Sequence, residues 1–363
     1  MSVFRPVRAH RPAADSARHL AAPELDAATL RAWRAEGRFS PEAEATFYVY
    51  QLRQAGHEQR GVVGAASVEA LDRRRIRRLE APREVAEEEE ARKLEEAGAV
   101  RGLVTLTYAA SPAVEEALES VTRFEPEYDF ISQAGVQHTF WTARGEAVGR
   151  LTRAMDEVPF FYVVDRPELA GAASRVQKRR RERRSVGPHD WFLAHAVPDS
   201  SLRALPVHRV ALALGGMLPA TLLEKLGWAF HVEPVADGRP AAPGHFGLYV
   251  EGRWYRLEPR EEVLPSAVAA RVDAALLQKL VVGPLLGVRE PLDSPLLESV
   301  AGDRDIPGLQ RKVDEGAARA VLLLHPPSVP SLLAAADAGH VLPPGSFRVD
   351  PQPLAGLALH VLD

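Results

Sequence analysis

The sequence predicts an α/β (α+β) protein in which strands and helices alternate along most of the chain. Stretches rich in β-branched and aromatic residues recur between charged or amphipathic stretches of helical length. A hairpin is indicated over residues 247–257, where Glu251-Gly252 forms the turn between two such stretches. With 363 residues, the chain is long enough for two domains or for one large α/β unit.

The predicted elements follow one another in a regular order. An irregular lead rich in alanine, proline and arginine occupies the first forty residues, and its one short helix spans 27–36. Alternating apolar and aromatic stretches predict strands at 45–52, 60–66, 102–108, 137–142, 160–164, 190–197, 207–214 and 320–325. Stretches with helical periodicity or charge patterning predict helices at 83–97, 113–122, 146–156, 267–282, 306–316 and 329–338.

The composition excludes several classes of function. The absence of cysteine excludes disulfides, thiolate metal sites and cysteine nucleophiles. A net charge of -4 gives no overall attraction to nucleic acid or to an anionic membrane. No stretch reaches the roughly 20 apolar residues of a membrane span, and the N-terminus lacks the apolar core of a signal peptide. We therefore expect a cytoplasmic, soluble protein that does not associate with membranes.

The common nucleotide and catalytic motifs are missing from the sequence. It contains no Gly-Lys pair for a phosphate loop, no Gly-x-Gly-x-x-Gly turn and no Gly-x-Ser-x-Gly motif. The 12 histidines do not have metal-ligand spacing, so we expect no metal site. Two arginine-rich segments, 73–78 and 178–184, have the charge to contact phosphates. The interpretation that we favour is a solvated surface, and nucleic-acid association through these segments is an alternative.

An ordered set of segments resembles one bacterial family. The segments are Phe4-Arg-Pro-Val-Arg-Ala-His-Arg-Pro12, Phe47–Tyr50, Gly61–Val68, Pro206–Val210, Asp273–Gln278, Leu286–Val288 and residues 318–357. The family that they resemble is catalogued as domain of unknown function one thousand and fifteen. It is placed in the ParB/sulfiredoxin superfamily and is related to free-serine kinases. The resemblance implies a mixed-sheet ParB-like core with a C-terminal α/β part. It divides the chain into a shortened lead at 1–40, a core at 41–205 and a C-terminal region at 206–363.

The chain departs from the family pattern where phosphate would bind. The family usually has Ala-Asp-Gly-His-His-Arg after a strand, and the corresponding residues here are Val164–Leu169, in which only Asp165 is retained. Glycine lets a backbone approach phosphate, and histidine and arginine donate to its oxygens. Here Pro167 has no N–H to donate and Glu168 would repel a phosphate. Arg166 is the one remaining donor in this box.

Two further signatures are also depleted. The family also has the pattern His-Glu-x-Thr-Arg-x-x-Lys-Glu, and this chain matches it only at Glu80, Arg83 and Glu87. The family tail carries Pro-Pro-Lys-Ser-Thr and a later Pro-Lys, but both lysines are missing here. Ser346 and Pro351-Gln352 stand at these places. The chain before Phe47 has 46 residues, about half of what the family usually has there.

The resemblance therefore implies a non-catalytic relative, or pseudoenzyme, which acts as a binding or regulatory protein. Its expected partner is a full-length paralogue or another protein, and no cofactor is expected. The alternative is a residual kinase for an amino-acid hydroxyl, which would use ATP or ADP with Mg²⁺. Its catalytic residues would be Glu80, Glu87 and Asp165. Its phosphate-binding residues would be Arg83, Arg166, His208, Arg209 and Ser346.

Several of these residues also have a structural interpretation, in which Glu80 and Arg83 would pair with each other on the surface. Glu87 would belong to the exposed acidic face of its helix, and Asp165 would cap a helix after its strand. His208 and Arg209 would satisfy buried backbone groups at the start of a strand. His138 would be a histidine on a strand surface rather than a base.

Overall fold

The computed structural model describes residues 2–182, 186–267, 270–302 and 305–362, and the chain forms two compact units. Unit 1 contains Met1–Arg78, Pro82–Arg203 and Pro351–Asp363, whereas unit 2 contains Leu79–Ala81 and Ala204–Asp350. Both units combine helices with strands, so the predicted fold class is confirmed. The units differ from the three predicted regions because the first forty residues and the tail both pack into unit 1.

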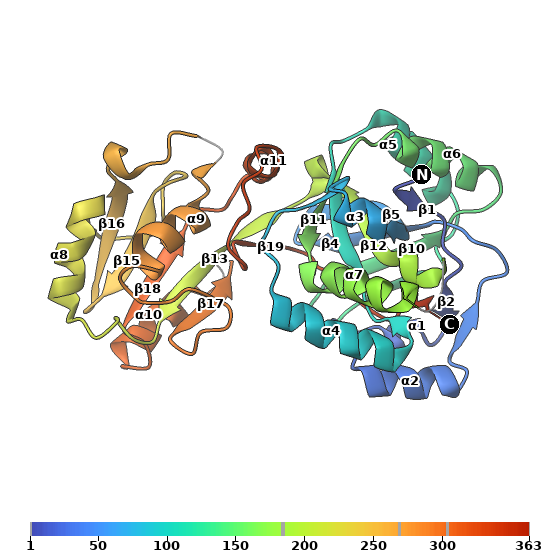
Figure 1. Ribbon diagram of the computed structural model, residues 1–363, viewed down its shortest axis with the longest axis horizontal. Helices are drawn as coiled ribbons and strands as arrows, with labels where there is room; N and C mark the ends of the chain where they lie inside the picture. The colour runs from blue at the N-terminus through green and yellow to red at the C-terminus, as the bar shows by residue number, and fades with distance from the viewer. Residues whose placement is uncertain (1, 183–185, 268–269, 303–304, 363) are drawn as a thin grey trace. The chain divides into compact units, whose positions relative to one another are not determined.

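Unit 1 is built on a mixed sheet (Figure 1). Its order is β6 (Ile76–Arg78), β11 (Phe161–Asp165), β8 (Val104–Tyr108), β12 (Trp191–Pro198), β5 (His57–Ser67), β4 (Tyr48–Gln54), β10 (Gln137–Thr142) and β9 (Tyr128–Ile131), with β1 (Phe4–Arg5) beside β5. The pairs β11–β6 and β12–β8 are parallel, and the other pairs of this sheet are antiparallel.

Helices cover both faces of this sheet. They are α1 (Ala17–Leu20), α2 (Ala27–Ala35), α3 (Val68–Asp72), α4 (Glu84–Ala97), α5 (Pro112–Thr122), α6 (Glu146–Asp156) and α7 (Pro167–Arg181). Strand β4 explains why two faces must be covered. Val49 packs into one apolar cluster with α5 and α6, whereas Tyr48 and Tyr50 pack into the opposite cluster with α4. The β-branched and aromatic residues that predicted this strand suit burial on both faces of a sheet.

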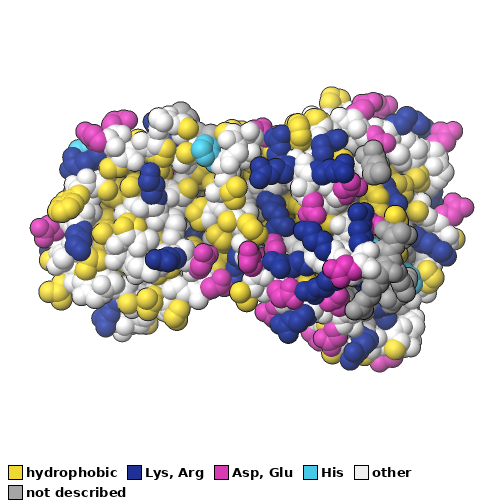
Figure 2. All heavy atoms as spheres, viewed as in Figure 1, with side chains coloured by type: hydrophobic (Ala, Val, Ile, Leu, Met, Phe, Trp, Pro, Cys, Tyr) yellow, Lys and Arg dark blue, Asp and Glu magenta, His cyan; other side chains and the backbone are white. Residues whose placement is uncertain are grey.

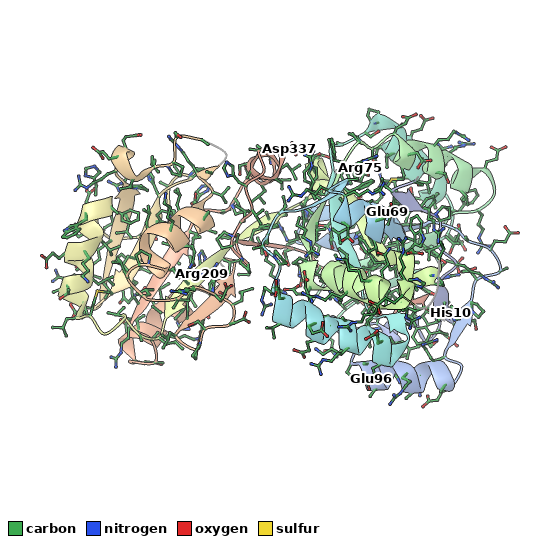
Figure 3. All side chains as sticks on the ribbon, in the orientation of Figure 1. His10, Glu69, Arg75, Glu96, Arg209 and Asp337 are labelled. Atoms are coloured by element: carbon green, nitrogen blue, oxygen red, sulfur yellow. The ribbon has the colours of Figure 1, made fainter. Side chains whose placement is uncertain are left out.

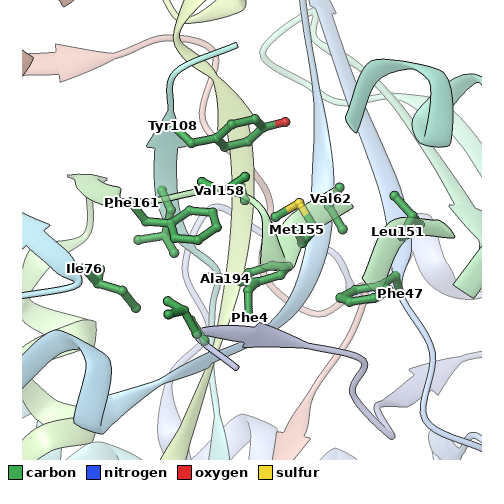
Figure 4. Close-up of a cluster of buried hydrophobic side chains, with 14 of the residues drawn as sticks. Phe4, Phe47, Val62, Ile76, Tyr108, Leu151, Met155, Val158, Phe161 and Ala194 are labelled. Atoms are coloured by element: carbon green, nitrogen blue, oxygen red, sulfur yellow. The ribbon is translucent and has the colours of Figure 1, made fainter. Parts of the chain in front are cut away.

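Figure 4 shows part of the cluster that contains α5 and α6. The Phe4 ring stacks on Phe47 at 5.9 Å between centroids and on Phe161 at 5.8 Å. All three rings are fully buried, and burying such a side chain stabilises a fold by about 1.5–3 kcal/mol. Strand β1, which has two residues, is therefore anchored by Phe4 as well as by its pairing with β5.

Helices α4 and α7 pack against each other and frame the candidate site of unit 1. The negative charges of Glu84 and Glu87 favour the first turn of α4, and Gly98, in the left-handed region at φ 62°, ends it. Helix α7 begins with Pro167 at its first position, where the missing N–H is not needed.

Unit 2 is built on an antiparallel sheet. Its order is β14 (Phe230–Val235), β16 (Arg253–Pro259), β15 (Phe246–Val250), β18 (Ala320–Leu324), β13 (Ala204–Ala211) and β17 (Leu297–Ala301), with β19 (Phe347–Val349) beside β13. Its helices are α8 (Pro219–Ala229), the short helix η3 (Glu261–Val263), α9 (Asp273–Leu277), the π-helix η5 (Gln278–Val282), α10 (Ile306–Asp314) and α11 (Val329–Asp337). On β18, Leu322 and Leu324 pack with α8 and α9, whereas Val321 and Leu323 pack with α10.

Both ends of the chain are tied into unit 1 by short strands. Strand β2 (His10–Pro12) pairs with β3 (Phe39–Pro41), and β20 (His360–Val361) pairs with β7 (Ala99–Val100). The tail also supplies Leu357, Ala358 and Leu362 to an apolar cluster of this unit. The tail therefore lies beside elements that are far from it in the sequence.

Most of the predicted helices and strands are confirmed, with ends shifted by a few residues. The helix predicted at 267–282 is partly wrong. Its helical part begins at Asp273 and changes to a π-helix at Gln278, and residues 268 and 269 lie outside the described residues. The first residues of the basic segment 178–184 form the end of helix α7, and its residues 183 and 184 also lie outside the described residues.

Candidate functional site

The turn between β11 and α7 holds two of the candidate residues. Asp165 ends β11, and Arg166 is the residue that precedes the first turn of α7. The structural interpretation of Asp165 as the helix cap is therefore wrong, because Arg166 takes that position. The backbone of Arg166 is left-handed, at φ 54° and ψ 50°, a conformation that costs a residue with a side chain roughly 1–2 kcal/mol. The family pattern has glycine at this position, so the turn keeps a glycine-type backbone without the glycine.

Asp165 and Gln352 come together although they are far apart in the sequence. The Gln352 side chain donates from Nε2 to Asp165 Oδ1 at 2.7 Å. Gln352 stands where the family tail carries its second lysine, and Asp165 is the one residue kept from the family box. The structure therefore brings a retained family position and a substituted one into direct contact in unit 1.

A cavity of about 390 Å³, the unit 1 cavity, lies between the starts of α4 and α7. Four of its lining residues are acidic and four are basic, namely Glu24, Glu89, Glu90, Glu168, Arg83, Lys93, Arg101 and Arg166. The structure therefore places the candidates Arg83 and Arg166 on one cavity. The charges of this lining balance.

The bases of the unit 1 cavity are engaged by groups of the protein. Arg83 Nη1 lies 3.0 Å from Glu168 Oε1, and Arg166 donates to the Pro23 carbonyl oxygen. Lys93 Nζ lies 2.7 Å from Glu89 Oε1 and 3.0 Å from Glu90 Oε1. Arg101 pairs with Glu90 and donates to the Leu25 carbonyl oxygen.

The Arg166 side chain lies against the backbone at Gly102. A β-carbon on Gly102 would lie 2.6 Å from Arg166 Nη1, which is closer than two such atoms can approach. The guanidinium of Arg166 is therefore held against the backbone. A ligand would have to displace protein contacts in order to use it.

Glu87 lies in the interface of α4 with α7 rather than on an exposed face. It is 5% exposed, pairs with Arg78, and lies 3.3 Å from Arg175 Nε. A β-carbon on Gly171 of α7 would lie 2.1 Å from the Glu87 carboxyl group. The interpretation of Glu87 as a solvated acidic residue is therefore wrong: its carboxylate is a buried counter-ion that joins two helices.

Glu80 lies in unit 2, where it holds the loop that precedes β19. Its carboxylate accepts hydrogen bonds from the backbone N–H of Gly345 at 3.1 Å and of Ser346 at 2.8 Å. Backbone hydrogen bonds also join Ala81 to the Leu342 oxygen and Leu342 to the Leu79 oxygen, each at 2.8 Å. We call Glu80 and these two N–H groups the Glu80 clamp. The Ser346 hydroxyl donates to the Pro343 oxygen at 2.6 Å.

His208 and Arg209 are buried on β13 of the same unit. His208 is 0% exposed, and its Nδ1 accepts from the Leu324 N–H at 3.2 Å. Arg209, labelled in Figure 3, is 3% exposed and donates to the Gly345 oxygen at 2.7 Å and to Ser299 Oγ at 3.1 Å. Burial lowers the pKa of Arg209 to about 10, and the charge of Glu80 opposes this shift. The interpretation that both residues satisfy buried backbone groups is confirmed.

His138 differs from its predicted position on a strand surface. It is 1% exposed, and its Nδ1 lies 2.7 Å from the Tyr50 hydroxyl oxygen. Burial lowers the pKa of His138 to about 4, so the ring is neutral at pH 7. It packs 5.4 Å from the Phe130 ring and belongs to the core of unit 1. Because both faces of β10 are covered, alternation along the strand did not reveal this burial.

Neither a metal centre nor a membrane span is found in the described ranges of the chain. No group of three or more histidine, aspartate or glutamate side chains could hold a metal ion among the described residues. Within those same ranges, every helix is too short or too polar to cross a lipid bilayer.

Comparison with known proteins identifies the family. The sequence model of the family described as "Protein of unknown function (DUF1015)" matches residues 4–280. The chain belongs to this family. Membership of the DUF1015 family agrees with the resemblance carried by the hairpin and core segments. The wider ParB/sulfiredoxin relationship stays a prediction, and so does the cytoplasmic location. No curated protein matches this DUF1015 member in sequence.

Solved structures similar to this DUF1015 member share little sequence with it. A C-terminally truncated SbnI from Staphylococcus aureus is 11% identical, with a TM-score of 0.44, over 82% of this chain and 87% of that one. A free serine kinase in complex with AMP is 10% identical, with a TM-score of 0.41, over 78% and 86%. A conserved hypothetical protein from Pyrococcus furiosus is 10% identical, with a TM-score of 0.39, over 78% and 89%. Similarity at this level carries no argument about the chemistry of this chain.

Proposed function

We propose that this chain is a non-catalytic member of its family that acts as a binding or regulatory protein. One observation supports this most directly. The two phosphate-binding candidates on the unit 1 cavity, Arg83 and Arg166, are engaged by Glu168 and by the Pro23 oxygen. A phosphate entering the cavity would meet four carboxylates as well as four bases.

The chemistry of phosphoryl transfer explains why this balance matters. Enzymes stabilise the transferring group with cations, Mg²⁺ and backbone N–H groups that face it in the transition state. In this chain the glycine, the histidines and the final arginine of the family box are replaced by Arg166, Pro167, Glu168 and Leu169. Pro167 removes a backbone donor, and Glu168 adds a negative charge beside the remaining arginine.

The contacts of the other candidates also favour a non-catalytic protein over a residual kinase. Both oxygens of Glu80, the candidate base, accept backbone hydrogen bonds, so a substrate hydroxyl would compete with the loop that Glu80 holds. Asp165 accepts from Gln352, and Glu87 is buried between two arginines. Arg209 is engaged by a carbonyl oxygen and a hydroxyl within unit 2.

The surface charges give little support to the nucleic-acid alternative. Arg73 pairs with Glu69, Arg179 pairs with Glu88, and Arg181 pairs with Asp190. In Figure 2, dark blue and magenta side chains are interspersed on the face that carries α4 and α7. A nucleic-acid site would instead need a patch of predominantly positive charge.

A thermal-shift experiment tests the proposal. The purified full chain is heated with ATP, ADP or CTP, each with Mg²⁺ and with or without L-serine. A ligand at a hundred times its dissociation constant adds about 2.7 kcal/mol, which raises the Tm of a protein of this size by a few degrees. We expect no shift and, in a parallel assay by mass spectrometry, no phosphoserine.

Two variants make the outcome specific to the unit 1 cavity. Arg83→Ala removes a candidate phosphate ligand, and Arg153→Ala, at an exposed position on α6, makes the same change elsewhere in unit 1. The proposal would be overturned if a nucleotide raised the Tm of the parent chain and of Arg153→Ala but did not raise the Tm of Arg83→Ala. That result would favour the residual kinase. A partnership with a full-length paralogue stays a prediction, which co-purification of the two chains would test.

A further inference from the structure

Unit 2 contains a cavity of about 580 Å³, the unit 2 cavity, which includes none of the residues that the sequence assigned to a site. It lies among the end of β16, helix η3, the start of α9 and the start of α11, which are elements of one unit. Its volume is within the range of small-molecule sites, about 300–1,000 Å³. Much of its wall is apolar, formed by Pro243, Pro259, Leu264, Val272, Leu276 and Pro327.

A buried carboxyl group stands in the wall of this cavity. Asp273, the first residue of α9, is 7% exposed. Its Oδ1 accepts from the Gly244 N–H at 2.8 Å. Its Oδ2 has no partner in hydrogen-bonding geometry among the described residues, although the His325 N–H stabilises the charge of the carboxylate. A buried carboxylate that is not fully paired is unfavourable, and burial accordingly raises the pKa of Asp273 to about 6.

A second buried polar atom belongs to the same cavity. His245 lines it, and the Nδ1 of His245 is shielded from solvent without a hydrogen-bond partner among the described residues. Buried polar atoms are usually hydrogen-bonded in folded proteins, and a ligand in the cavity could supply partners for these two. Asp273 Oδ2 accepts hydrogen bonds, and a neutral imidazole nitrogen can do so as well.

The charge of the lining indicates which sign of charge the cavity favours in a ligand. Three carboxylates line the cavity, those of Glu258, Glu261 and Asp273, whereas Arg271 is its one lysine or arginine among the described residues. Arg271 donates from Nε to the Pro265 oxygen at 2.8 Å. The excess of acidic groups attracts a cation, and the apolar wall accommodates a hydrocarbon body.

We propose that the unit 2 cavity binds a small organic cation, an alkyl primary amine whose ammonium donates hydrogen bonds to Asp273 and His245. An ammonium group has three donors and no acceptor, so it can donate both to the Asp273 carboxylate and to a neutral imidazole nitrogen of His245. Its alkyl chain lies against the proline and leucine side chains of the wall. This inference stands independently of the proposed function, because the unit 2 cavity shares no lining residue with the unit 1 cavity.

The test uses the full chain and three probes of similar shape. These are n-butylamine, which is a cation at pH 7, n-butanol, which is neutral, and butyrate, which is an anion. Binding is measured by thermal shift and by isothermal titration calorimetry. We expect n-butylamine to bind and raise the Tm, and we expect neither of the other probes to do so.

Asp273→Asn removes the charge and is compared with Glu224→Gln, which makes the same change of charge at an exposed position on α8. The loss of a buried charged partner costs about 2 kcal/mol or more, so we expect Asp273→Asn to weaken butylamine binding by about thirtyfold or more. Glu224→Gln should bind as the parent chain does. Should Asp273→Asn fail to fold, Ala334→Trp places a large side chain at the exposed edge of the cavity and should also prevent binding.

Three results would overturn the proposal. One is that n-butylamine does not bind at millimolar concentration, whether or not MgCl₂ alone raises the Tm in an Asp273-dependent way, which would assign the carboxyl group to an inorganic cation instead. Another is that n-butanol binds as well as the amine. The third is that the folded Asp273→Asn variant keeps the affinity for the amine.

Discussion

Replacement of Glu80 by alanine is expected to release the loop that the Glu80 clamp holds. The carboxylate accepts from the N–H groups of Gly345 at 3.1 Å and Ser346 at 2.8 Å. Its negative charge also opposes the lowering of the Arg209 pKa by burial. Alanine removes both effects. It leaves a 3% exposed guanidinium whose partners include the Gly345 oxygen and Ser299 Oγ.

The size of the effect follows from these contacts. A hydrogen bond to a charged group contributes roughly 1.5–3 kcal/mol. Gly345 is only partly buried, so its N–H regains a water partner and the lower end of that range applies to it. Ser346 is 3% exposed, so its N–H regains less from water and the loss of its hydrogen bond costs more. We therefore expect Glu80→Ala to destabilise the loop by about 3 kcal/mol. Glu80→Gln keeps one neutral acceptor, and we expect it to cost about half as much.

Amide hydrogen exchange is the suitable assay, because a two-unit protein need not unfold in one step. A loss of about 3 kcal/mol corresponds to exchange on the order of a hundredfold faster at Gly345 and Ser346. Glu224→Ala, at an exposed position on α8, serves as the matched control and should leave both amides protected. Unchanged protection in Glu80→Ala would refute the reasoning. It would mean that other contacts hold the loop and that Glu80 is available as a base.

Three further predictions concern single side chains. Arg166→Gly should be more stable than Arg166→Ala by about 1 kcal/mol, because φ at this position is 54°; equal urea midpoints would mean that the turn changes its backbone conformation. Gln352→Glu should destabilise unit 1 at pH 7 by about 1 kcal/mol, because the new carboxylate would lie beside Asp165 in place of a donor at 2.7 Å. That loss should disappear in Gln352→Lys, and equal urea stabilities of the two variants would contradict the predicted contact. The pKa of Asp273 is raised from 3.8 to about 6 in the folded chain. The contribution of this group to the free energy of unfolding is therefore fully present below pH 3.8 and is lost as the pH rises through 6. Compared with Asp273→Asn, the parent chain should therefore lose about 3 kcal/mol of stability between pH 4 and pH 7. The neighbouring charged and ionisable side chains, those of His245, His325, Glu258, Glu261 and Arg271, are the same in both chains, so the comparison isolates Asp273. A pH-independent difference between the two chains would contradict the raised pKa of the buried Asp273 carboxyl group.

The sequence predicted those elements whose pattern is long enough to show a period. Helix α6 lies at the predicted residues Glu146–Asp156, and strand β10 lies at the predicted Gln137–Thr142. Strands of two residues, such as β1 and β20, are too short to show alternation, and they form because distant strands are available to pair with them. The return of the tail to unit 1 depends on such pairing and on tertiary packing, which no local pattern contains.

The candidate site shows the same limit. The motif comparison pointed to Asp165 and to Gln352 separately, but only the fold places one beside the other. Glu87 was assigned to an exposed acidic face because three further glutamates adjoin it, whereas its burial depends on the neighbouring Gly171. Asp273 begins a segment that resembles the family, but the sequence indicates no role for its side chain. Its role in a cavity depends on Gly244 and on helix α11, which the sequence does not connect to it.

Charge balance, rather than the strength of individual ion pairs, decides what the unit 1 cavity can bind. The pair of Arg83 with Glu168 is about one quarter exposed on each side, and partly exposed pairs contribute at most about 1 kcal/mol, so a phosphate could displace it at little cost. The displaced carboxylate would nevertheless remain in the lining. At an effective dielectric constant of about 20, two unit charges about 5 Å apart interact by about 3 kcal/mol. With four carboxylates and four bases, attraction and repulsion of this size nearly cancel for any anion in the cavity. This balance supports our proposal that Arg83 and Arg166 alone do not make the cavity a phosphate site, because the acidic residues around them offset their positive charge.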